Sequence, residues 1–193
     1  MADVAKESGA DLIGLVFANS KRQVDSTTAR EISRQVPGIG KVGVFVNAPL
    51  AEVQDIARQC KLDYVQLHGD ESAAYCRQLA LPVIKAIRPE AATIQAINDY
   101  PAEWILVDSY SQGRFGGSGV PFGWSDFQKV RQKITKSVII AGGLHADNVK
   151  EAIQLLAPDG VDVSSGVECN GTKSAAKIKQ FISAVREEGG YHA

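Results

Sequence analysis

The sequence predicts an α/β protein built as a (β/α)8 barrel, also called a TIM barrel. Short apolar segments rich in β-branched residues alternate along the chain with longer segments of helical period. Strand–helix–strand repeats of this kind pair in parallel through right-handed crossovers. Glycines and polar residues follow the later strands, at the end of the strands where such a barrel carries its active site.

Seven segments are expected to be strands, and two of them, 104–108 (WILVD) and 137–141 (SVIIA), are nearly continuous apolar runs, as strands buried on both faces are. The seven are residues 11–17, 41–47, 63–67, 82–87, 104–108, 137–141 and 160–164. The helices expected between and after them are residues 26–35, 49–59, 71–79, 90–99, 125–134, 146–156 and 172–187. Ser26 and Asp70 stand where capping residues are expected, and Pro49 stands in a first turn.

An open, doubly wound sheet is the competing architecture. A dinucleotide-binding sheet of that kind needs a glycine-rich turn directly after an early strand, but the first strand is followed by ANSKRQ. The barrel is therefore favoured, although it requires eight strands. The chain opens with a helical segment, residues 1–8, that no strand precedes. We expect a single barrel domain over residues 1–193 in which the first strand is missing.

Composition excludes several function classes. The 193 residues are 45% hydrophobic and carry a net charge of −1, so the strongly basic surface of a nucleic-acid-binding protein is not expected. No apolar run is long enough for a membrane span, and no signal peptide is expected at the start. The three cysteines, Cys60, Cys76 and Cys169, have no metal-ligand spacing and fit a reducing compartment, which predicts a cytoplasmic protein.

Two late strands end in sequences suited to a phosphate group. Gly142 and Gly143 follow one of them, and Ser164, Ser165 and Gly166 follow the next. Glycines let backbone N–H groups approach an anion closely, a helix N-terminus adds a favourable dipole, and the last two loops of such barrels often bind phosphate. Tight turns alone would also use glycine, but two adjacent strand ends of this kind favour a phosphate site. No lysine is required there, because amides and hydroxyls supply the donors.

Asp108 stands where the strand 104–108 meets the mouth of the barrel. Partial desolvation of a carboxyl group raises its pKa and suits it to act as a general acid, whereas an aspartate that only caps a turn is the structural alternative. Residues 109–123, which follow, contain five glycines, at positions 113, 116, 117, 119 and 123. A segment this long and glycine-rich is expected to be a lid over bound substrate rather than a plain connector.

The remaining polar candidates lie at earlier strand ends. Gln66, His68 and Asp70 come from DYVQLHGDES, where a histidine either shuttles protons or makes a structural hydrogen bond. Arg22 follows the first strand and could bind a carboxylate through two hydrogen bonds, although many loop arginines are merely solvated. Cys60 and Cys76 are expected to be buried and inert, whereas Cys169 follows the last strand and could reach the mouth.

Taken together, these segments resemble the phosphoribosylanthranilate isomerase family of tryptophan biosynthesis. The resemblance covers nearly the whole chain in the family's order, through the strings GADLIGLVF, SKRQV, KVGVFVN, DYVQLHGDES, VIKAIR, ILVDS, FGGSG, PFGWS, IIAGGLHADNV and GVDVSSGVE. It implies a cofactor-free and metal-free Amadori rearrangement of an aminoribose phosphate that carries anthranilate on its anomeric carbon. The product is an open-chain aminoketose.

The resemblance also implies roles for individual residues. Asp108 would be the general acid, Arg22 would bind the anthranilate carboxylate, and His68 occupies a family position with a less defined role. The phosphate would bind at Gly142, Gly143, Ser164, Ser165 and Gly166. The family's base is a cysteine in a K-x-C-G-type motif of the first strand, and none of the three cysteines of this chain occupies an equivalent position.

Loss of the base should leave the chain nearly inactive, since a general acid or base contributes about 10²–10⁴-fold. We expect that Met1 is an internal methionine or a mis-set start, and that codons upstream encode the missing strand. The edges of the strands 11–17 and 160–164 would otherwise lack their shared neighbour. Alternatively the chain folds with a gap, or pairs its open edges across a dimer.

Two alternatives to this isomerase are considered. Another phosphosugar barrel enzyme of tryptophan or histidine biosynthesis would use different groups, and Lys85, within an expected strand, keeps a lysine-based chemistry open. A non-catalytic module that binds a phosphorylated ligand is the second alternative. In each case the expected partner is a small phosphorylated molecule, with no nucleic acid and no membrane, and the protein is expected to be a monomer or a homodimer.

Overall fold

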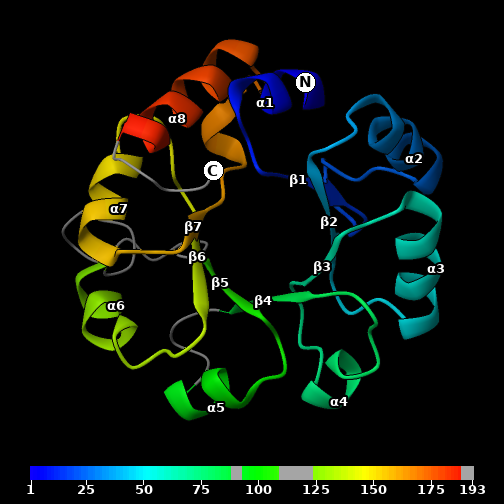
Figure 1. Cartoon of the computed structure of the whole chain (residues 1–193), viewed down its shortest axis with the longest axis horizontal. Helices are drawn as coiled ribbons and strands as arrows, with labels where there is room; N and C mark the ends of the chain where they lie inside the picture. The colour runs from blue at the N-terminus through cyan, green and yellow to red at the C-terminus, as the bar shows by residue number, and fades with distance from the viewer. Residues whose placement is uncertain (88–92, 109–123, 188–193) are drawn as a thin grey trace.

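The computed structural model describes residues 1–87, 93–108 and 124–187. Their strands form a curved parallel sheet of seven strands in the order β1-β2-β3-β4-β5-β6-β7, and helices surround its outer face (Figure 1). The strands are β1 (Leu12–Val16), β2 (Gly40–Phe45), β3 (Tyr64–Leu67), β4 (Val83–Ile87), β5 (Trp104–Asp108), β6 (Ser137–Ala141) and β7 (Gly160–Val161). The fold is thus of the expected TIM-barrel type with one strand fewer than eight.

Eight α-helices are present among the described residues, and those between strands cross over the outer face. They are α1 (Ala2–Ser8), α2 (Ser26–Gln35), α3 (Leu50–Cys60), α4 (Ala73–Cys76), α5 (Ile94–Asp99), α6 (Trp124–Arg131), α7 (Val149–Leu156) and α8 (Ala175–Glu187). A 3-10 turn, Ser165–Val167, and a two-stranded hairpin of β8 (Glu168–Cys169) and β9 (Thr172–Lys173) stand between β7 and α8. No described helix is long and apolar enough to cross a membrane.

Alternation along the strands divides the apolar side chains into two layers. The inner layer, inside the curve of the sheet, is a small cluster; its buried members are Val42, Ile84, Ala86, Leu106, Ile139 and Ala141. The outer layer lies between sheet and helices and is much larger, with Phe45, Leu67, Ile105 and Ile140 among its fully buried side chains. At the carboxyl ends of the strands, residues whose side chains point to the inner side of the sheet therefore face the mouth.

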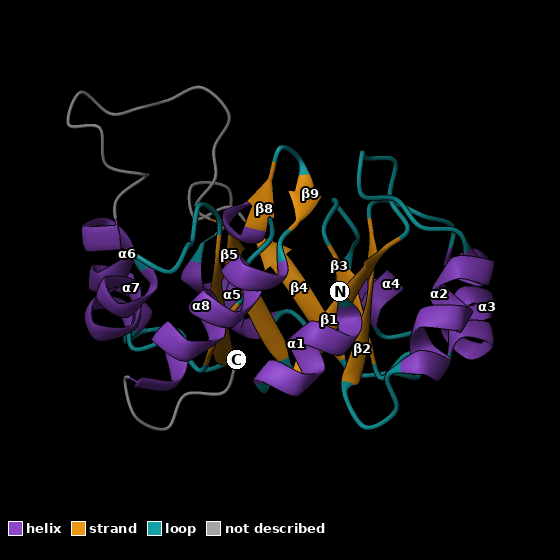
Figure 2. Ribbon diagram, turned by 90° about the horizontal axis from the view of Figure 1, so that it is seen from above, coloured by secondary structure: helices purple, strands orange, loops and turns teal. Residues whose placement is uncertain are grey.

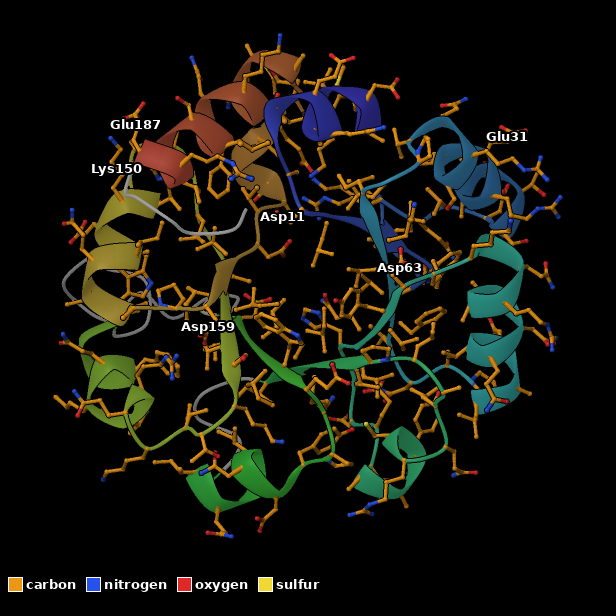
Figure 3. All side chains as sticks on the ribbon, viewed as in Figure 1. Asp11, Glu31, Asp63, Lys150, Asp159 and Glu187 are labelled. Carbon is orange, nitrogen blue, oxygen red and sulfur yellow. The ribbon has the colours of Figure 1, made fainter. Side chains whose placement is uncertain are left out.

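Aspartates fix the rim opposite the mouth, where the strands begin. Asp63 precedes β3 and accepts a hydrogen bond from the Lys41 amide at 2.8 Å, and Asp159 precedes β7 and accepts one from the Val138 amide at 2.7 Å (Figure 3). Each carboxylate thus joins the start of its own strand to the start of the preceding one. These side chains hold the register of the sheet and take no part in the site.

The sheet is open between β1 and β7, because no ladder among the described residues joins these two strands. We call this gap the seam. On its outer side α1 and α8 lie side by side (Figure 1), and the Arg186 guanidinium of α8 donates to the carbonyl of Gly9 and lies 3.7 Å from the Asp11 carboxylate. Leu12 on the inner face of β1 remains 37% exposed, as expected where the inner layer lacks a neighbour.

The expected and observed elements differ most clearly at three places. The expected helix 71–79 is a single turn, α4, capped by Ser72 rather than Asp70, because Gln78 and Leu79 make i→i−3 bonds that tighten and end it. The expected strand 160–164 ends at Val161, and Ser164 leaves extended geometry with ψ of −80°. Residues 172–173 of the expected last helix instead form β9, because Asn170 and Gly171 adopt positive φ in the two-residue hairpin loop.

Candidate active site

The carboxyl ends of the strands and the loops that follow them gather on one side of the sheet, together with the β8–β9 hairpin (Figure 2). Asp108, the last residue of β5, pairs in register with Ala141 of β6. Its side chain points to the inner side of the sheet, like that of Leu106 two residues earlier. Its carboxyl group therefore faces the mouth, as the sequence predicted. Asp108 lies beside His68: its Oδ2 is 3.5 Å from the ring Nε2.

His68 follows β3, and its backbone amide donates to the Phe45 carbonyl at 2.8 Å, so it extends the strand by one residue. Its side chain points the same way as that of Gln66, whose amide Nε2 lies 3.0 Å from the His68 ring Nδ1. Gln66 is buried and His68 half-buried. The structure thus brings together three residues named from the sequence, Gln66, His68 and Asp108. Asp70, the third polar residue of this segment, is exposed.

A second carboxylate, Asp162, belongs to the same mouth and was missed in the sequence. Its backbone amide donates to the Ile140 carbonyl at 2.9 Å, which continues β7 by one residue and turns the side chain inward beside Ala141. Enclosure by the surrounding protein raises the pKa of the Asp162 carboxyl, the Asp108 charge raises it further, and Lys173 opposes both. Part of the Asp162 surface is nevertheless exposed to solvent.

The two expected phosphate loops are in contact with each other. Gly142 and Gly143 follow β6 with φ of 87° and 69°, a conformation that glycine adopts without strain. Asn148 closes this loop by accepting from the His145 amide and donating to the Gly143 carbonyl. Gly166, in the 3-10 turn after Ser164 and Ser165, packs so tightly that an added Cβ would lie 1.8 Å from the Leu144 carbonyl oxygen.

A lysine also lies at this loop pair, although none was expected to be needed. Lys173 Nζ donates to the Ser164 carbonyl at 2.8 Å and lies 3.5 Å from the Ser164 hydroxyl oxygen. Burial lowers the pKa of Lys173, and the nearby Glu168 carboxylate opposes this effect. A signal for its position was present in the sequence: C-N-G-T predicts a hairpin turn, and that hairpin returns the chain to the mouth at Lys173.

Arg22 reaches across the seam from the loop after β1 to the hairpin. It donates to Glu168 through Nε at 2.6 Å and through its terminal NH2 nitrogen at 3.1 Å. This pair lowers the pKa of the Glu168 carboxyl to about 2. The guanidinium is therefore placed and oriented to grip a carboxylate, and in this structure the carboxylate is one of the protein's own.

Lys85 does not face the mouth, so the lysine-based alternative loses its candidate. Its side chain points to the outer face of β4, and Nζ lies 3.0 Å from the buried Glu71 carboxylate. It also donates to the Leu67 carbonyl at 3.2 Å and to the Gly69 carbonyl. The ion pair instead anchors the backbone on both sides of His68.

The cysteines lie where their segments led us to expect. Cys60 and Cys76 are buried in the outer layer, and burial raises the pKa of both thiols. Cys169 is exposed on β8. Among the described residues no group of three or more metal-ligating side chains is present. The expected lid, 109–123, lies outside the described residues.

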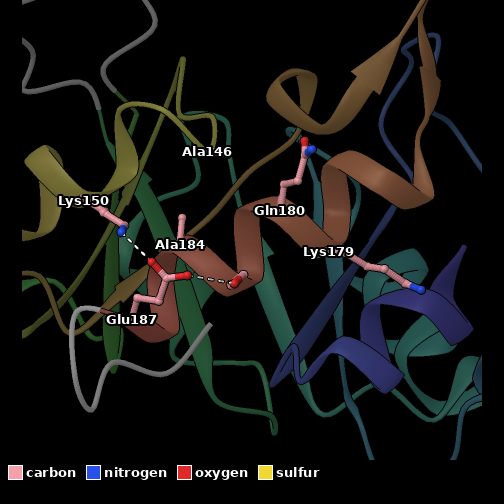
Figure 4. Close-up of a pocket in the computed structure, with 7 residues that line it drawn as sticks. Ala146, Lys150, Lys179, Gln180, Ala184 and Glu187 are labelled. Carbon is pink, nitrogen blue, oxygen red and sulfur yellow. Dashed lines mark hydrogen bonds and ion pairs between the residues drawn. The ribbon is translucent and has the colours of Figure 1, made fainter.

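A groove of about 480 Å³ lies between α7 and α8 on the outer surface (Figure 4). Lys150 and Glu187 form an ion pair of 2.6 Å across it, and none of the predicted site residues lines it. The mouth, and not this groove, is the candidate active site.

Comparison with known proteins identifies the family of the chain. The family model described as N-(5'-phosphoribosyl)anthranilate (PRA) isomerase matches residues 2–184. The chain belongs to this family. It is 45% identical over 189 residues to the N-(5'-phosphoribosyl)anthranilate isomerase of Oceanobacillus iheyensis, covering 97% of this chain and 92% of the relative.

Solved structures of the family superpose on nearly the whole chain. The phosphoribosyl anthranilate isomerase of Thermotoga maritima has a TM-score of 0.85 and 38% identity, covering 96% of this chain and 93% of that one. A phosphoribosyl anthranilate isomerase in complex with reduced 1-(o-carboxyphenylamino)-1-deoxyribulose 5-phosphate has a TM-score of 0.83 and 37% identity, covering 96% and 92%. The chain is thus an isomerase of the TIM-barrel class.

Proposed function

We propose that the chain isomerises N-(5'-phosphoribosyl)anthranilate to 1-(2-carboxyphenylamino)-1-deoxyribulose 5-phosphate, a step of tryptophan biosynthesis, with its reacting groups in the mouth described above. The observation that carries this proposal is the placement of Asp108 at 3.5 Å from His68, in a family member whose two glycine-bearing loops meet at Gly166. One end of the mouth thus offers a proton donor and the other a place for a phosphate.

Asp108 acts as the general acid in this proposal. It donates a proton to the ring oxygen of the aminosugar, the bond between that oxygen and C1 breaks, and the nitrogen lone pair forms an iminium ion. A base must then take the C2 proton, which gives an enolamine that tautomerises to the ketone. The family resemblance assigns this step to a cysteine for which the chain has no equivalent, so we expect the step to be slow. No cofactor or metal is required, because every step is a proton transfer or an internal shift of an electron pair.

The remaining site residues bind the substrate. Backbone amides at Gly142, Gly143 and Gly166 and the hydroxyls of Ser164 and Ser165 hold the phosphate, and Lys173 supplies a positive charge beside them. Arg22 binds the anthranilate carboxylate. Its bonds to Glu168 use two of the five N–H donors of a guanidinium, so a second carboxylate can share it or displace Glu168.

The test is loss of anthranilate fluorescence from freshly prepared substrate, followed with enzyme in excess so that a slow turnover is still measured. Asp108→Asn keeps the shape of the side chain and removes the proton donor, so we expect the rate to fall by about 10²–10⁴-fold. Asp55→Asn, on the exposed face of α3, is the matched control and should leave the rate unchanged. Equal rates for Asp108→Asn and the unmodified chain would contradict the proposal.

We also propose that the protein works in the cytoplasm as a monomer or homodimer. All three cysteines are free thiols, which is typical of proteins in a reducing compartment. Sedimentation of the full chain would measure its oligomeric state.

A further inference from the structure

Gln66 is an amide buried on the apolar inner face of the sheet. Its side chain is in register with Val44 on one side and Ile84 on the other, and the residue is 8% exposed. An amide in such surroundings destabilises the fold unless it is hydrogen-bonded. The partner it has is the His68 ring, 3.0 Å from Gln66 Nε2 to His68 Nδ1. An apolar residue would pack equally well here, so packing does not explain the amide. Its contact with His68 does.

The contact selects one of the two neutral forms of His68. With the amide nitrogen of Gln66 turned to the ring, Nδ1 accepts the hydrogen bond and the ring proton lies on Nε2. Nε2 is the nitrogen that faces Asp108, with Oδ2 at 3.5 Å. In the other form the Gln66 amide would have to turn its oxygen to Nδ1, and a lone pair of Nε2 would face the carboxylate.

We propose that Gln66 is a positioning residue that fixes His68 with its proton on Nε2, so that Asp108 always meets an N–H donor. This inference rests on the proposed role of Asp108 as the general acid. An acid becomes a carboxylate when it gives up its proton, and an N–H aimed at it stabilises that carboxylate. Gln66 thus favours proton release from Asp108 without touching the substrate.

The charges around the ring are consistent with this assignment. Asp108 and Asp162 are the carboxylates near His68, and the ring and Lys173 are the positive or donor groups that act on Asp162. Arg22 is paired with Glu168 on the hairpin. Both carboxylates therefore favour a proton on His68 Nε2, which faces the mouth. Gln66 donates to the other ring nitrogen, Nδ1.

The test reads the ring nitrogens directly. The chain has three histidines, so two-dimensional 15N NMR of the full chain gives three ring systems, and His68→Gln identifies the signals of His68. At pH 8.5 we expect a bare Nδ1 and a protonated Nε2. Gln66→Glu, in which a carboxylate replaces the donor, should place a proton on Nδ1, and Gln66→Met should let both neutral forms interconvert.

Two readings would overturn the proposal: a proton on Nδ1 in the unmodified chain, or a fully bare Nδ1 in both Gln66 variants. Gln54→Glu is the matched control, because Gln54 also donates its amide, to the Gln78 carbonyl, but on the exposed face of α3. It should leave the His68 signals unchanged. Urea unfolding of each variant shows whether the chain remains folded during the NMR measurement.

The same variants are then assayed for isomerisation. Misplacement of a reacting group can reduce the rate by about 10²-fold, and we expect a fall of this order in kcat for Gln66→Glu and Gln66→Met, with KM little changed. Unchanged kcat would overturn the role of Gln66 in the reaction. The proposed function is tested separately by Asp108→Asn, so a failure of one can be told from a failure of the other.

Discussion

Gly166 has no room for a side chain. An added Cβ would lie 1.8 Å from the carbonyl oxygen of Leu144, and this contact joins the two candidate phosphate loops. We expect Gly166→Ala to lower the free energy of unfolding by about 1–3 kcal/mol, as overpacked substitutions do, because the loops must move apart. The same movement should weaken the binding of inorganic phosphate, measured by calorimetry.

Gly160 provides the matched control for this prediction. A Cβ there would lie 3.6 Å from the Ile139 side chain, which is an ordinary contact, and the residue belongs to the neighbouring strand β7. Gly160→Ala should leave phosphate binding as it is. If both variants bind phosphate equally well, the two loops do not form the phosphate site.

Glu168 makes the stability of the protein depend on pH in a defined direction. Its pKa in the folded protein is about 2, lowered from 4.5 chiefly by its hydrogen bonds with Arg22. A carboxyl with a lower pKa in the folded than in the unfolded chain stabilises the fold fully above the unfolded value. That contribution is lost as the pH falls from about 4.5 towards 2.

Urea unfolding at a series of pH values measures this effect. The difference in unfolding free energy between the unmodified chain and Glu168→Gln should be constant above pH 5 and shrink steadily on acidification. Glu31→Gln on the exposed face of α2 is the matched control. A difference for Glu168→Gln that does not change with pH would show that the ion pair with Arg22 adds nothing to stability.

At the scale of elements, the hydrophobic pattern of the sequence predicts the strands and helices that depend on residues adjacent in the chain. It does not predict the short hairpin, where the chain folds back on itself. All seven strands were predictable, because strands buried on both faces carry apolar runs such as SVIIA. The hairpin was not predicted, since its strands have two residues each and β9 falls within the expected helix 172–187. The C-N-G-T turn was the one sequence signal that could have identified it.

The same distinction applies to the site. Asp108 and His68 could be predicted because each follows a recognisable strand, and strand ends meet at one rim. Asp162 was missed because it lies inside GVDVSS, a segment that we interpreted only through its serines and the following glycine, as phosphate-binding residues. The bonds of Arg22 to Glu168 join residues 146 positions apart, and no local pattern contains such a contact.

The loop between β3 and α4 depends on a buried ion pair. Lys85 donates to the carbonyls on both sides of His68, and Glu71 accepts from the amides of Asn47 and Gly69. Burial tends to raise the pKa of Glu71, but its hydrogen bonds and Lys85 outweigh burial, so the pKa is lowered. The backbone on both sides of His68 is thus held by Lys85 of β4 and by Glu71 in the loop after β3.

Lys85→Met should destabilise the protein by about 3–5 kcal/mol, because it leaves a buried carboxylate without its partner. Lys85→Met combined with Glu71→Gln removes both charges and should recover part of the loss. Lys150→Met breaks a shorter ion pair on the surface and should cost no more than about 1 kcal/mol. Equal losses for the buried and the surface lysine, measured by urea unfolding, would contradict this account.

For the whole molecule, the seam makes stability uneven around the sheet. β4 has a hydrogen-bonded strand on each side, whereas β1 and β7 each have one neighbour among the described strands. The Phe17 amide donates to Val44 of β2, so alternate amides of β1 point to β2 and the others point into the seam. On the outer side α1 packs against α8, and Arg186 contacts Gly9 and Asp11.

Hydrogen exchange measured residue by residue should therefore follow distance from the seam. We expect the amides of β4 to exchange only through global unfolding, and those of β1 and β7 through local opening at lower free energy. Arg186→Ala releases Gly9 and Asp11 and should speed exchange in β1 while leaving β4 unchanged. If β1 proves as protected as β4 in both proteins, then the seam is closed in solution by contacts that this arrangement of strands does not contain.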